Sequence, residues 1–226
     1  MTILKYQLFG KNSIGVYLEV NNIYGLYPAS LLEVAVNKIK SVFEEPLFPF
    51  SVNNSSLLGV YIASNKYGIV LPQIIKDEEL EKLKGYLSEF NGEFQVGVLS
   101  SKDNAFGNLI LCNDHGAIIS SILKEYRKEI EDILNVETIV YEFANQHLPG
   151  SIAVANNHGC AVHPLSSDEE IEIVSSILKV KEADVSTVNR GIPYLSSGAV
   201  VNDKSGIFGF SCTGPEMMRL TYVLNL

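Results

Sequence analysis

Short apolar runs and polar turns alternate along the chain in a pattern that repeats five times. In each repeat a glycine precedes an apolar run, an asparagine-containing turn closes on a second glycine, and a further apolar run follows. Asparagine and glycine both tolerate positive φ, so the pattern predicts two strands joined by a tight hairpin turn. The repeats cover residues 14–44, 58–87, 106–134, 149–178 and 197–224, and their turn glycines, 43 to 48 residues apart, are Gly25, Gly68, Gly116, Gly159 and Gly206.

A helix is predicted at the end of each repeat. Capping boxes begin at Ser30, Ser166 and Thr213, each with a glutamate three residues later, and this arrangement is typical of a helix N-terminus. Apolar residues then recur at helical spacing. They are Leu80, Leu83, Leu87 and Phe90 in the second repeat, Ile122, Tyr126, Ile130 and Ile133 in the third, and Ile171, Val174 and Leu178 in the fourth.

Another strand-like run follows each helix, so the expected unit is strand, strand, helix, strand. The N-terminal run MTILKYQLF is expected to supply this last strand for the first unit. One unit cannot bury both of its faces, whereas five units around an axis can share a core. The sequence therefore predicts an α+β fold, a five-bladed α/β propeller in one domain over 1–226, with pseudo-symmetric units at about 1–45, 46–92, 93–135, 136–180 and 181–226.

Charge and composition narrow the classes of partner. The 226 residues include 17 basic and 26 acidic side chains, a formal net charge of −9, and no long basic run. Nucleic acid as the main partner is disfavoured, because phosphate binding requires a basic face. The N-terminus does not resemble a signal peptide, no apolar stretch is long enough for a membrane span, and the three cysteines form no disulfide framework, so we expect a protein of the reducing cytoplasm. We expect a monomer, because a closed ring leaves no obvious edge strand.

Two histidines and a cysteine lie close together in the fourth repeat, at His158, Cys160 and His163. Residues three apart in a strand point to opposite faces, so Cys160 and His163 are not expected to share a metal ion. Cys160 also occupies a small apolar strand position of the repeat. Cys212 precedes the last predicted helix, where a thiol can have a lowered pKa, and His163 is the one candidate for its base. No metal or cofactor is expected.

Several motifs match one known family in order and at the expected spacing. The C-terminal third carries TVNRGIP at 187–193, SGAVVND at 197–203 and TGPE at 213–216, and earlier matches lie at 107–108, 112–114 and 157–164. Over essentially its full length the chain resembles the archaeal form of the translation initiation factor 6 family, whose fold is the pentein.

The resemblance implies a function that composition does not indicate. Members of this family are ribosome anti-association factors that bind the large ribosomal subunit where the small subunit would dock. They contact a ribosomal protein near the sarcin–ricin loop, with a minor contact to ribosomal RNA, and block subunit joining sterically. They also take part in large-subunit biogenesis, and they are not enzymes.

The expected ribosome-binding residues follow from the repeat and the resemblance together. Loops before the first strand of each unit should gather at one end of the axis, with a polar surface and exposed apolar anchors. Asn108 matches the family position tied most clearly to subunit binding. By pseudosymmetry its neighbours are Val16, Val60, Ser151 and Ala199, and the remaining candidates are Gly59, Gly107, Gly150, Asn189 and Arg190.

Two other functions remain open. Other penteins modify guanidino groups with a cysteine, a histidine and carboxylates around the central channel, and here Cys212 and His163 would be the reacting pair. No run of carboxylates accompanies them in the axial strand positions. The third possibility is a protein-binding scaffold unrelated to ribosomes.

Overall fold

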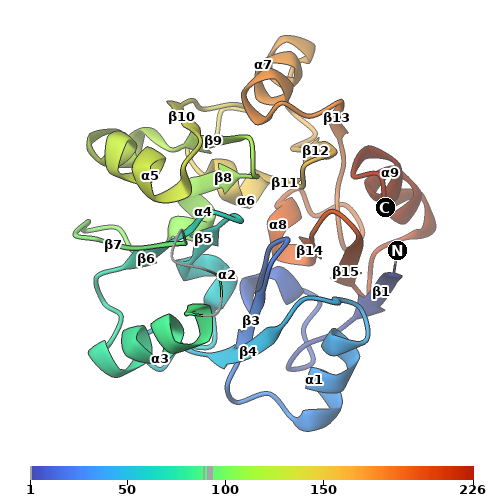
Figure 1. Ribbon diagram of the computed structural model, residues 1–226. Coiled ribbons are helices and arrows are strands. Elements are labelled where there is room, and N and C mark those ends of the chain that lie inside the picture. Colours follow the sequence, from blue (N-terminus) through green and yellow to red (C-terminus); the bar gives the residue numbers. More distant parts are fainter. Residues whose placement is uncertain (1, 89, 91–93) are drawn as a thin grey trace.

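Five small sheets stand around a central axis in the computed structural model (Figure 1), which describes residues 2–88, 90 and 94–226. One-turn helices lie near the centre of the view, and longer helices lie at its periphery. The predicted α+β fold of five pseudo-symmetric units is confirmed. In the described part of the chain, no helix combines the length and the apolar character that crossing a bilayer requires.

Each sheet has three strands, which we call inner, middle and outer by their distance from the axis. The inner strand pairs antiparallel with the middle strand through a short turn, and the outer strand pairs parallel with the middle strand. A parallel pair requires a crossover, and the peripheral helix supplies it. The inner strands are β2 (Glu19–Val20), β5 (Ala63–Ser64), β8 (Ile110–Cys112), β11 (Ala153–Ala155) and β14 (Ala199–Val201); the middle strands are β3 (Gly25–Pro28), β6 (Gly68–Pro72), β9 (Gly116–Ile119), β12 (Gly159–Val162) and β15 (Ser205–Gly209); the outer strands are β4 (Leu47–Phe50), β7 (Gln95–Leu99), β10 (Glu137–Val140), β13 (Glu182–Val185) and β1 (Thr2–Tyr6).

The N-terminal strand closes the ring, and the expectation that it belongs to the first unit is wrong. It pairs with β15 of the fifth sheet, from Thr2 opposite Ser205 to Tyr6 opposite Gly209. The first sheet is already complete, because β4 pairs with β3. An outer strand therefore belongs to the sheet before it, and the expected unit boundaries at 45/46, 135/136 and 180/181 separate three outer strands from their sheets. The boundary at 92/93 lies outside the described residues.

The sheets are not joined edge to edge, which corrects the picture of a ring without edge strands. Each of the five is a separate three-stranded sheet, so its outer strand keeps one free edge. The apolar core lies between neighbouring sheets: Val70 of the second sheet and Ile119 of the third share one buried cluster with Ile130 of a peripheral helix. Packing between side chains, rather than continuous strand pairing, therefore holds the ring together.

The peripheral helices lie near the predicted positions, with differences at their N-termini. The capping box at Thr213 and Glu216 is confirmed. In the fourth unit the cap is Ser167 with Glu170, one residue later than predicted, and the first peripheral helix begins after Leu32 without a side-chain cap. These helices are α1 (Glu33–Lys40), α3 (Asp77–Leu87), α5 (Arg127–Leu134) preceded by the 3-10 helix η2 (Ser121–Tyr126), α7 (Asp168–Leu178) and α9 (Gly214–Val223).

Most of the helically spaced apolar residues face the core, as predicted. Leu83, Leu87, Ile130, Val174 and Leu178 are buried. Ile122 is the exception with 47% of its surface exposed, because it lies in η2, whose 3-10 geometry turns side chains by a different angle from an α-helix.

Five one-turn helices precede the inner strands, and the sequence pattern missed all of them. The apolar run that begins each repeat was expected to be a strand throughout, but its first residues form a helix and only its last residues form the inner strand. The five helices contact one another in a closed ring. We call them the axial helices: η1 (Ile14–Val16), α2 (Leu58–Tyr61), α4 (Phe106–Leu109), α6 (Pro149–Ile152) and α8 (Leu195–Gly198).

The hairpin turns form for a different reason from the one expected. None of the turn asparagines or turn glycines has positive φ. Each asparagine side-chain oxygen instead accepts hydrogen bonds from two backbone N–H groups; Asn156, for example, accepts them from His158 and Gly159 at 2.9 Å each. Counting from the asparagine places Tyr24 and Ser205 where the fourth unit has Gly159, so Gly25 and Gly206 are both one residue off the repeat. The five turn asparagines are Asn21, Asn65, Asn113, Asn156 and Asn202.

Glycine is needed at the turn because another unit packs against it. A Cβ atom added at Gly159 would lie 1.7 Å from the carbonyl oxygen of Val223, which belongs to the helix of the fifth unit. At Gly68 and Gly116 the corresponding atoms are the carbonyl oxygens of Ile133 and Ile177, both 2.0 Å away. The turn glycine thus serves the contact between units and not the turn conformation.

The asparagine amides link each unit to the next. Nδ2 of Asn156 donates to the carbonyl oxygens of Asn202 at 3.2 Å and Leu224 at 2.8 Å. Asn65 and Asn113 each make the same pair of bonds to the unit that follows their own. At the junction of the fifth and first units, Nδ2 of Asn202 is buried and has no hydrogen-bond partner among the described residues.

This difference predicts unequal effects of one substitution at two equivalent positions. Asn156→Asp removes two donated hydrogen bonds, whereas Asn202→Asp removes none, and both replacements bury a carboxyl group. We expect Asn156→Asp to reduce the free energy of unfolding by about 2 kcal/mol more than Asn202→Asp, at roughly 1 kcal/mol for each lost bond. Urea unfolding of the two variants measures the difference, and equal losses would contradict the role given to the amides.

Candidate functional site

The axial helices approach closely because their second residue is small. A Cβ atom added at Gly59 would lie 1.9 Å from the carbonyl oxygen of Gly15, and one added at Gly107 would lie 2.1 Å from that of Gly59. Gly150 meets the carbonyl oxygen of Gly107 in the same way, at 2.2 Å. The fifth unit has Ser196 at this position, and its hydroxyl donates to the carbonyl oxygen of Ser151 at 3.2 Å. The glycines therefore fix the ring of helices around the axis.

The third residue of four of the five axial helices lies at the mouth of the axis. A depression with a cavity volume of about 240 Å³ opens there, lined by Val16, Asn108, Ser151 and Ser197 together with Leu148 and Tyr194. We call this mouth and the loops that lead into the axial helices the axial surface. Its loops cover residues 9–13, 53–57, 102–105, 144–148 and 189–194.

Of the four residues expected around Asn108, the structure places three at the equivalent position and displaces the fourth. Val16, Val60 and Ser151 occupy the position equivalent to Asn108 in their helices. Ala199 does not, because it begins β14 and only 4% of its surface is exposed. The equivalent residue is Ser197, which the repeat pattern missed because Gly198 ends its helix instead of standing second in it. The buried apolar residue that begins each helix, such as Phe106 or Leu195, would have given the correct alignment.

The loops of the axial surface expose apolar anchors and few acids. Phe9, Ile192 and Tyr194 are 48%, 44% and 45% exposed. The charged side chains on these loops, all of them exposed, are Lys11, Lys102 and Arg190 with one acid, Asp103. The acidic excess of the chain therefore lies elsewhere, and the axial surface is weakly basic where the whole protein has a net charge of −9.

Glutamates of the peripheral helices hold three of these loops in shape. Glu216 of α9 accepts hydrogen bonds from the backbone N–H groups of Arg190 at 3.2 Å and Gly191 at 2.9 Å. Glu79 of α3 binds the N–H groups of Asn53 and Asn54 in the same way, and Glu170 of α7 binds that of Ala144. The bonded residues of these loops have positive φ, a conformation that costs free energy and needs such support.

The two polar candidates of the fifth loop have different surroundings. Asn189 is half-buried, and its Nδ2 donates to the carbonyl oxygen of Asn12 at 3.1 Å. The side chain of Arg190 is exposed, while its backbone is held by Glu216. Asn189 thus connects two loops of the axial surface, and Arg190 presents its charge to solvent.

The hydrogen bonds to Glu216 predict a loss of stability in acid. Burial opposes ionisation of this carboxyl, but bonds from Thr213, Gly191 and Thr187 outweigh it and lower its pKa to about 2. A carboxyl with a depressed pKa in the folded protein stabilises it above the unfolded pKa of about 4.3, and this contribution disappears as the pH falls towards 2. We expect Glu216→Gln to remove about 2 kcal/mol of stability at pH 7 and little at pH 2.

Thermal unfolding between pH 2 and 7 measures this effect. The exposed Glu172→Gln on α7 is the matched control, and it should leave the pH dependence of the wild type unchanged. A Glu216→Gln variant as stable as the wild type at pH 7 would show that the carboxylate does not support the loop.

The cysteines and histidines considered for catalysis are separated by their contacts. Sγ of Cys212 accepts a hydrogen bond from the backbone N–H of Asn189 at 3.2 Å, and burial raises the pKa of its thiol, contrary to the lowered pKa considered from the sequence. Nδ1 of His163 instead accepts a bond from the N–H of Leu165. No hydrogen bond joins Cys212 to His163 within the described residues. Cys160 is fully buried on β12, and His158 is exposed in the turn before it.

Comparisons with known proteins cover nearly the whole chain. Residues 3–223 match the eIF-6 family. The proteins named Translation initiation factor 6 of Methanocaldococcus jannaschii and Staphylothermus marinus are 39% and 37% identical to the chain, over 100% and 97% of its length and 99% and 96% of theirs. The protein of the same name from Pyrobaculum aerophilum is 34% identical over 99% of both chains. A match of this length and identity shows that the chain belongs to the eIF-6 family.

Proposed function

We propose that this protein is a translation factor that binds the large ribosomal subunit through its axial surface and thereby prevents the small subunit from joining. The observation that carries the proposal is the full-length match to proteins named Translation initiation factor 6. The mechanism is occlusion: binding free energy gained on one surface excludes a second partner from the same place. It requires a rigid surface and no catalytic group.

The chemistry of the axial surface supports this choice of face. Exposed aromatic and aliphatic side chains around a neutral polar centre are typical of the anchors of a protein interface. The ribosomal subunit also presents phosphates, which repel acidic surfaces. Lys11, Lys102 and Arg190 surround this face with only one acid among its loops, so it is the part of an acidic protein that can approach RNA. The partner is then a ribosomal protein at the subunit-joining surface, with ribosomal RNA as a minor contact.

The same binding fits a second role and a particular setting. A factor held on the joining surface can stay there while the large subunit matures, which is the biogenesis role implied by the family. Its place of work is the cytoplasm, where subunits are assembled and joined. We propose that it acts as a monomer, because one axial surface fits one ribosomal site, and size-exclusion chromatography measures this directly.

Co-sedimentation with purified ribosomal subunits tests the proposed function. The protein should pellet with the large subunit alone, and it should reduce the formation of joined ribosomes when small subunits are added. Binding to the small subunit, or binding to the large subunit without an effect on joining, would overturn the proposal.

A further inference from the structure

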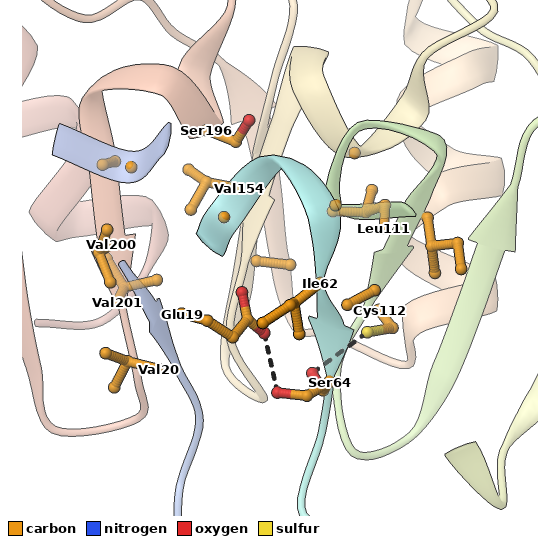
Figure 2. A pocket seen from close by; sticks show the side chains of 18 of the residues that line it. Glu19, Val20, Ile62, Ser64, Leu111, Cys112, Val154, Ser196, Val200 and Val201 are labelled. Carbon is orange, nitrogen blue, oxygen red and sulfur yellow. Dashed lines mark hydrogen bonds between the residues drawn. The ribbon is translucent and has the colours of Figure 1, made fainter. Parts of the chain in front are cut away.

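A cavity of about 130 Å³ lies on the axis below the ring of axial helices. The inner strands of all five sheets line it, and Figure 2 shows their side chains around it. We call this cavity the lumen. Gly15, Gly59 and Ser196 line both the lumen and the depression of the axial surface, so the two spaces are neighbours. The inner-strand residues that line the lumen are Glu19 and Val20 of β2, Ala63 and Ser64 of β5, Ile110, Leu111 and Cys112 of β8, Ala153, Val154 and Ala155 of β11, and Ala199, Val200 and Val201 of β14.

Glu19 is the single acidic residue among the described residues that line the lumen. Lysine, arginine and histidine are all missing from the described lining. Figure 2 shows the carboxyl group of Glu19 reaching across to Ser64, whose hydroxyl donates to Oε1 at 2.8 Å. Ser64 is fixed in turn by Nδ2 of Asn21, which donates to its Oγ at 2.9 Å. Oε2 of Glu19 makes no hydrogen bond to the described residues, so half of the carboxyl group is free to bind something else.

Burial raises the pKa of Glu19 to about 8, because no cation compensates its charge. The surface of Glu19 that remains accessible faces the lumen, so partial exposure and a raised pKa agree. The titratable groups nearest to it are Cys112 on β8 and Tyr24 at the start of β3. Burial is the main cause that raises the pKa of both groups, and the negative charge of ionised Glu19 raises it further. Cys112 and Tyr24 therefore stay neutral over the pH range in which Glu19 ionises.

A second polar group beside this cluster lacks a partner. The hydroxyl of Tyr24 is fully buried and makes no hydrogen bond to the described residues. Tyr24 follows Asn21, whose Oδ1 accepts the backbone N–H of Tyr24 at 3.0 Å. Buried polar groups normally find partners, since an unmade hydrogen bond costs about 1 to 3 kcal/mol. Tyr24 does not line the lumen, so the polar side chains that the inner strands offer to a ligand there are those of Glu19 and Ser64.

We propose that the lumen is a binding site for a small primary ammonium ion, with the carboxylate of Glu19 as its counter-ion. An ammonium group carries one positive charge and N–H donors, which match the free Oε2 of Glu19 and the oxygen of Ser64. The other walls include the methyl groups of Val154, Val200 and Val201, which can contact a short alkyl substituent. A cavity of roughly 150 Å³ accommodates a molecule as large as benzene. A divalent metal fits poorly, because the described residues contain no cluster of three or more carboxylate, histidine or cysteine ligands.

Binding in this site is linked to one proton. The resting carboxyl is neutral at pH 7, so it must release its proton when the ammonium ion enters, and the charge of the lumen is then balanced. Because the released proton appears in the equilibrium, binding should strengthen as the pH rises from 6 to 9. For a carboxyl with a pKa of about 8 the apparent Kd should fall on the order of 100-fold over this range.

Methylammonium chloride is the probe, and the carboxyl resonances of glutamate are the readout. In protein labelled with ¹³C at the glutamate carboxyl, we expect the Glu19 resonance at pH 7 to move to its ionised position as methylammonium is added to about 100 mM, a concentration chosen for weak binding. Tetramethylammonium chloride has the same charge but no N–H donor and a larger volume, and it should leave the resonance in place. Sodium chloride at the same concentration controls for ionic strength.

Glu19→Gln supplies the matched variant. Glutamine has nearly the shape of the neutral carboxyl, so the fold and its stability at pH 7 should be kept. Methylammonium should raise the thermal unfolding midpoint of the wild type over that in sodium chloride, and it should give Glu19→Gln no such increase. A Glu19 resonance that does not move, or a response to tetramethylammonium equal to that to methylammonium, would overturn the proposal. Neither outcome depends on ribosome binding, so the site and the proposed function fail or stand separately.

Discussion

Asn108→Arg should weaken binding to the large ribosomal subunit by about 100-fold or more, the effect expected when a charged, bulky side chain enters the centre of an interface. Asn108 is half-buried in the depression of the axial surface, beside Ser151 and Ser197. An arginine there would fill the depression and bring an unpaired charge into it, and burying such a charge costs several kcal/mol. Co-sedimentation gives the Kd, and the subunit-joining assay should show a parallel loss of inhibition.

Asn37→Arg is the control, since it makes the same change of residue at an exposed position on α1, away from the axis. It should bind and inhibit as the wild type does. If both variants bind normally, the large subunit is contacted by another face. If both lose binding, added positive charge itself disturbs the interaction and the axial surface has no special role.

Gly59→Ala should cause a large loss of stability, because it adds a methyl group where two axial helices touch. The added Cβ atom would lie 1.9 Å from the carbonyl oxygen of Gly15 and 2.7 Å from that of Leu18. Both obstacles are backbone atoms, one in η1 and one just after it, so no side chain can rotate away and the ring must open. We expect a loss of about 3 kcal/mol or more in the free energy of unfolding, as for severe overpacking, measured by urea denaturation.

Gly85→Ala should act in the opposite direction. Gly85 lies within α3, and a Cβ atom there would meet nothing within 4 Å. Alanine is favoured over glycine in a helix interior by about 0.8 to 1 kcal/mol, so this variant should be more stable than the wild type. If Gly59→Ala and Gly85→Ala changed the free energy of unfolding by a comparable amount, glycine on the axis would be dispensable and the packing argument for the ring would fail.

Much of the architecture could be predicted from the sequence because the pattern occurs five times. A single Asn-containing turn between apolar runs is weak evidence, but five at a near-constant spacing define a repeat. The axial helices were missed because each has only one turn. Four residues such as Phe106–Leu109 are too few to show helical spacing, and an apolar run of this length is equally compatible with a strand.

The errors within the site have a common origin in the alignment of glycines. The repeat pattern aligns the units on their glycines, yet glycine serves different contacts at different positions. In the fifth unit the packing against the next helix is made by Ser196, and Gly198 has another place. This moved the expected neighbour of Asn108 from Ser197 to Ala199. Buried apolar residues would have been better reference points, because the core constrains them in every unit.

Glu19 could not be recognised from the sequence. It stands in the run YLEV with apolar residues around it, and a glutamate in a short strand usually faces water. Its placement in the lumen depends on the register of β2 against β3, where Glu19 lies opposite Leu26, and on four other inner strands far away in the chain. No local pattern contains that information.

The pairing of β1 with β15 sets the order in which a newly made chain can mature. The backbone N–H of Thr2 donates a hydrogen bond to the side-chain oxygen of Ser205, which lies 203 positions later in the chain. Synthesis proceeds from the N-terminus, so four sheets can form from adjacent segments while β1 waits for a partner that does not yet exist. Long-range pairing of this kind is slow and leaves a strand edge open to other chains. A transcript that ends between β14 and β15 would therefore yield a protein with four finished sheets and two unpaired strands, β1 and β14, which quality-control proteases can detect.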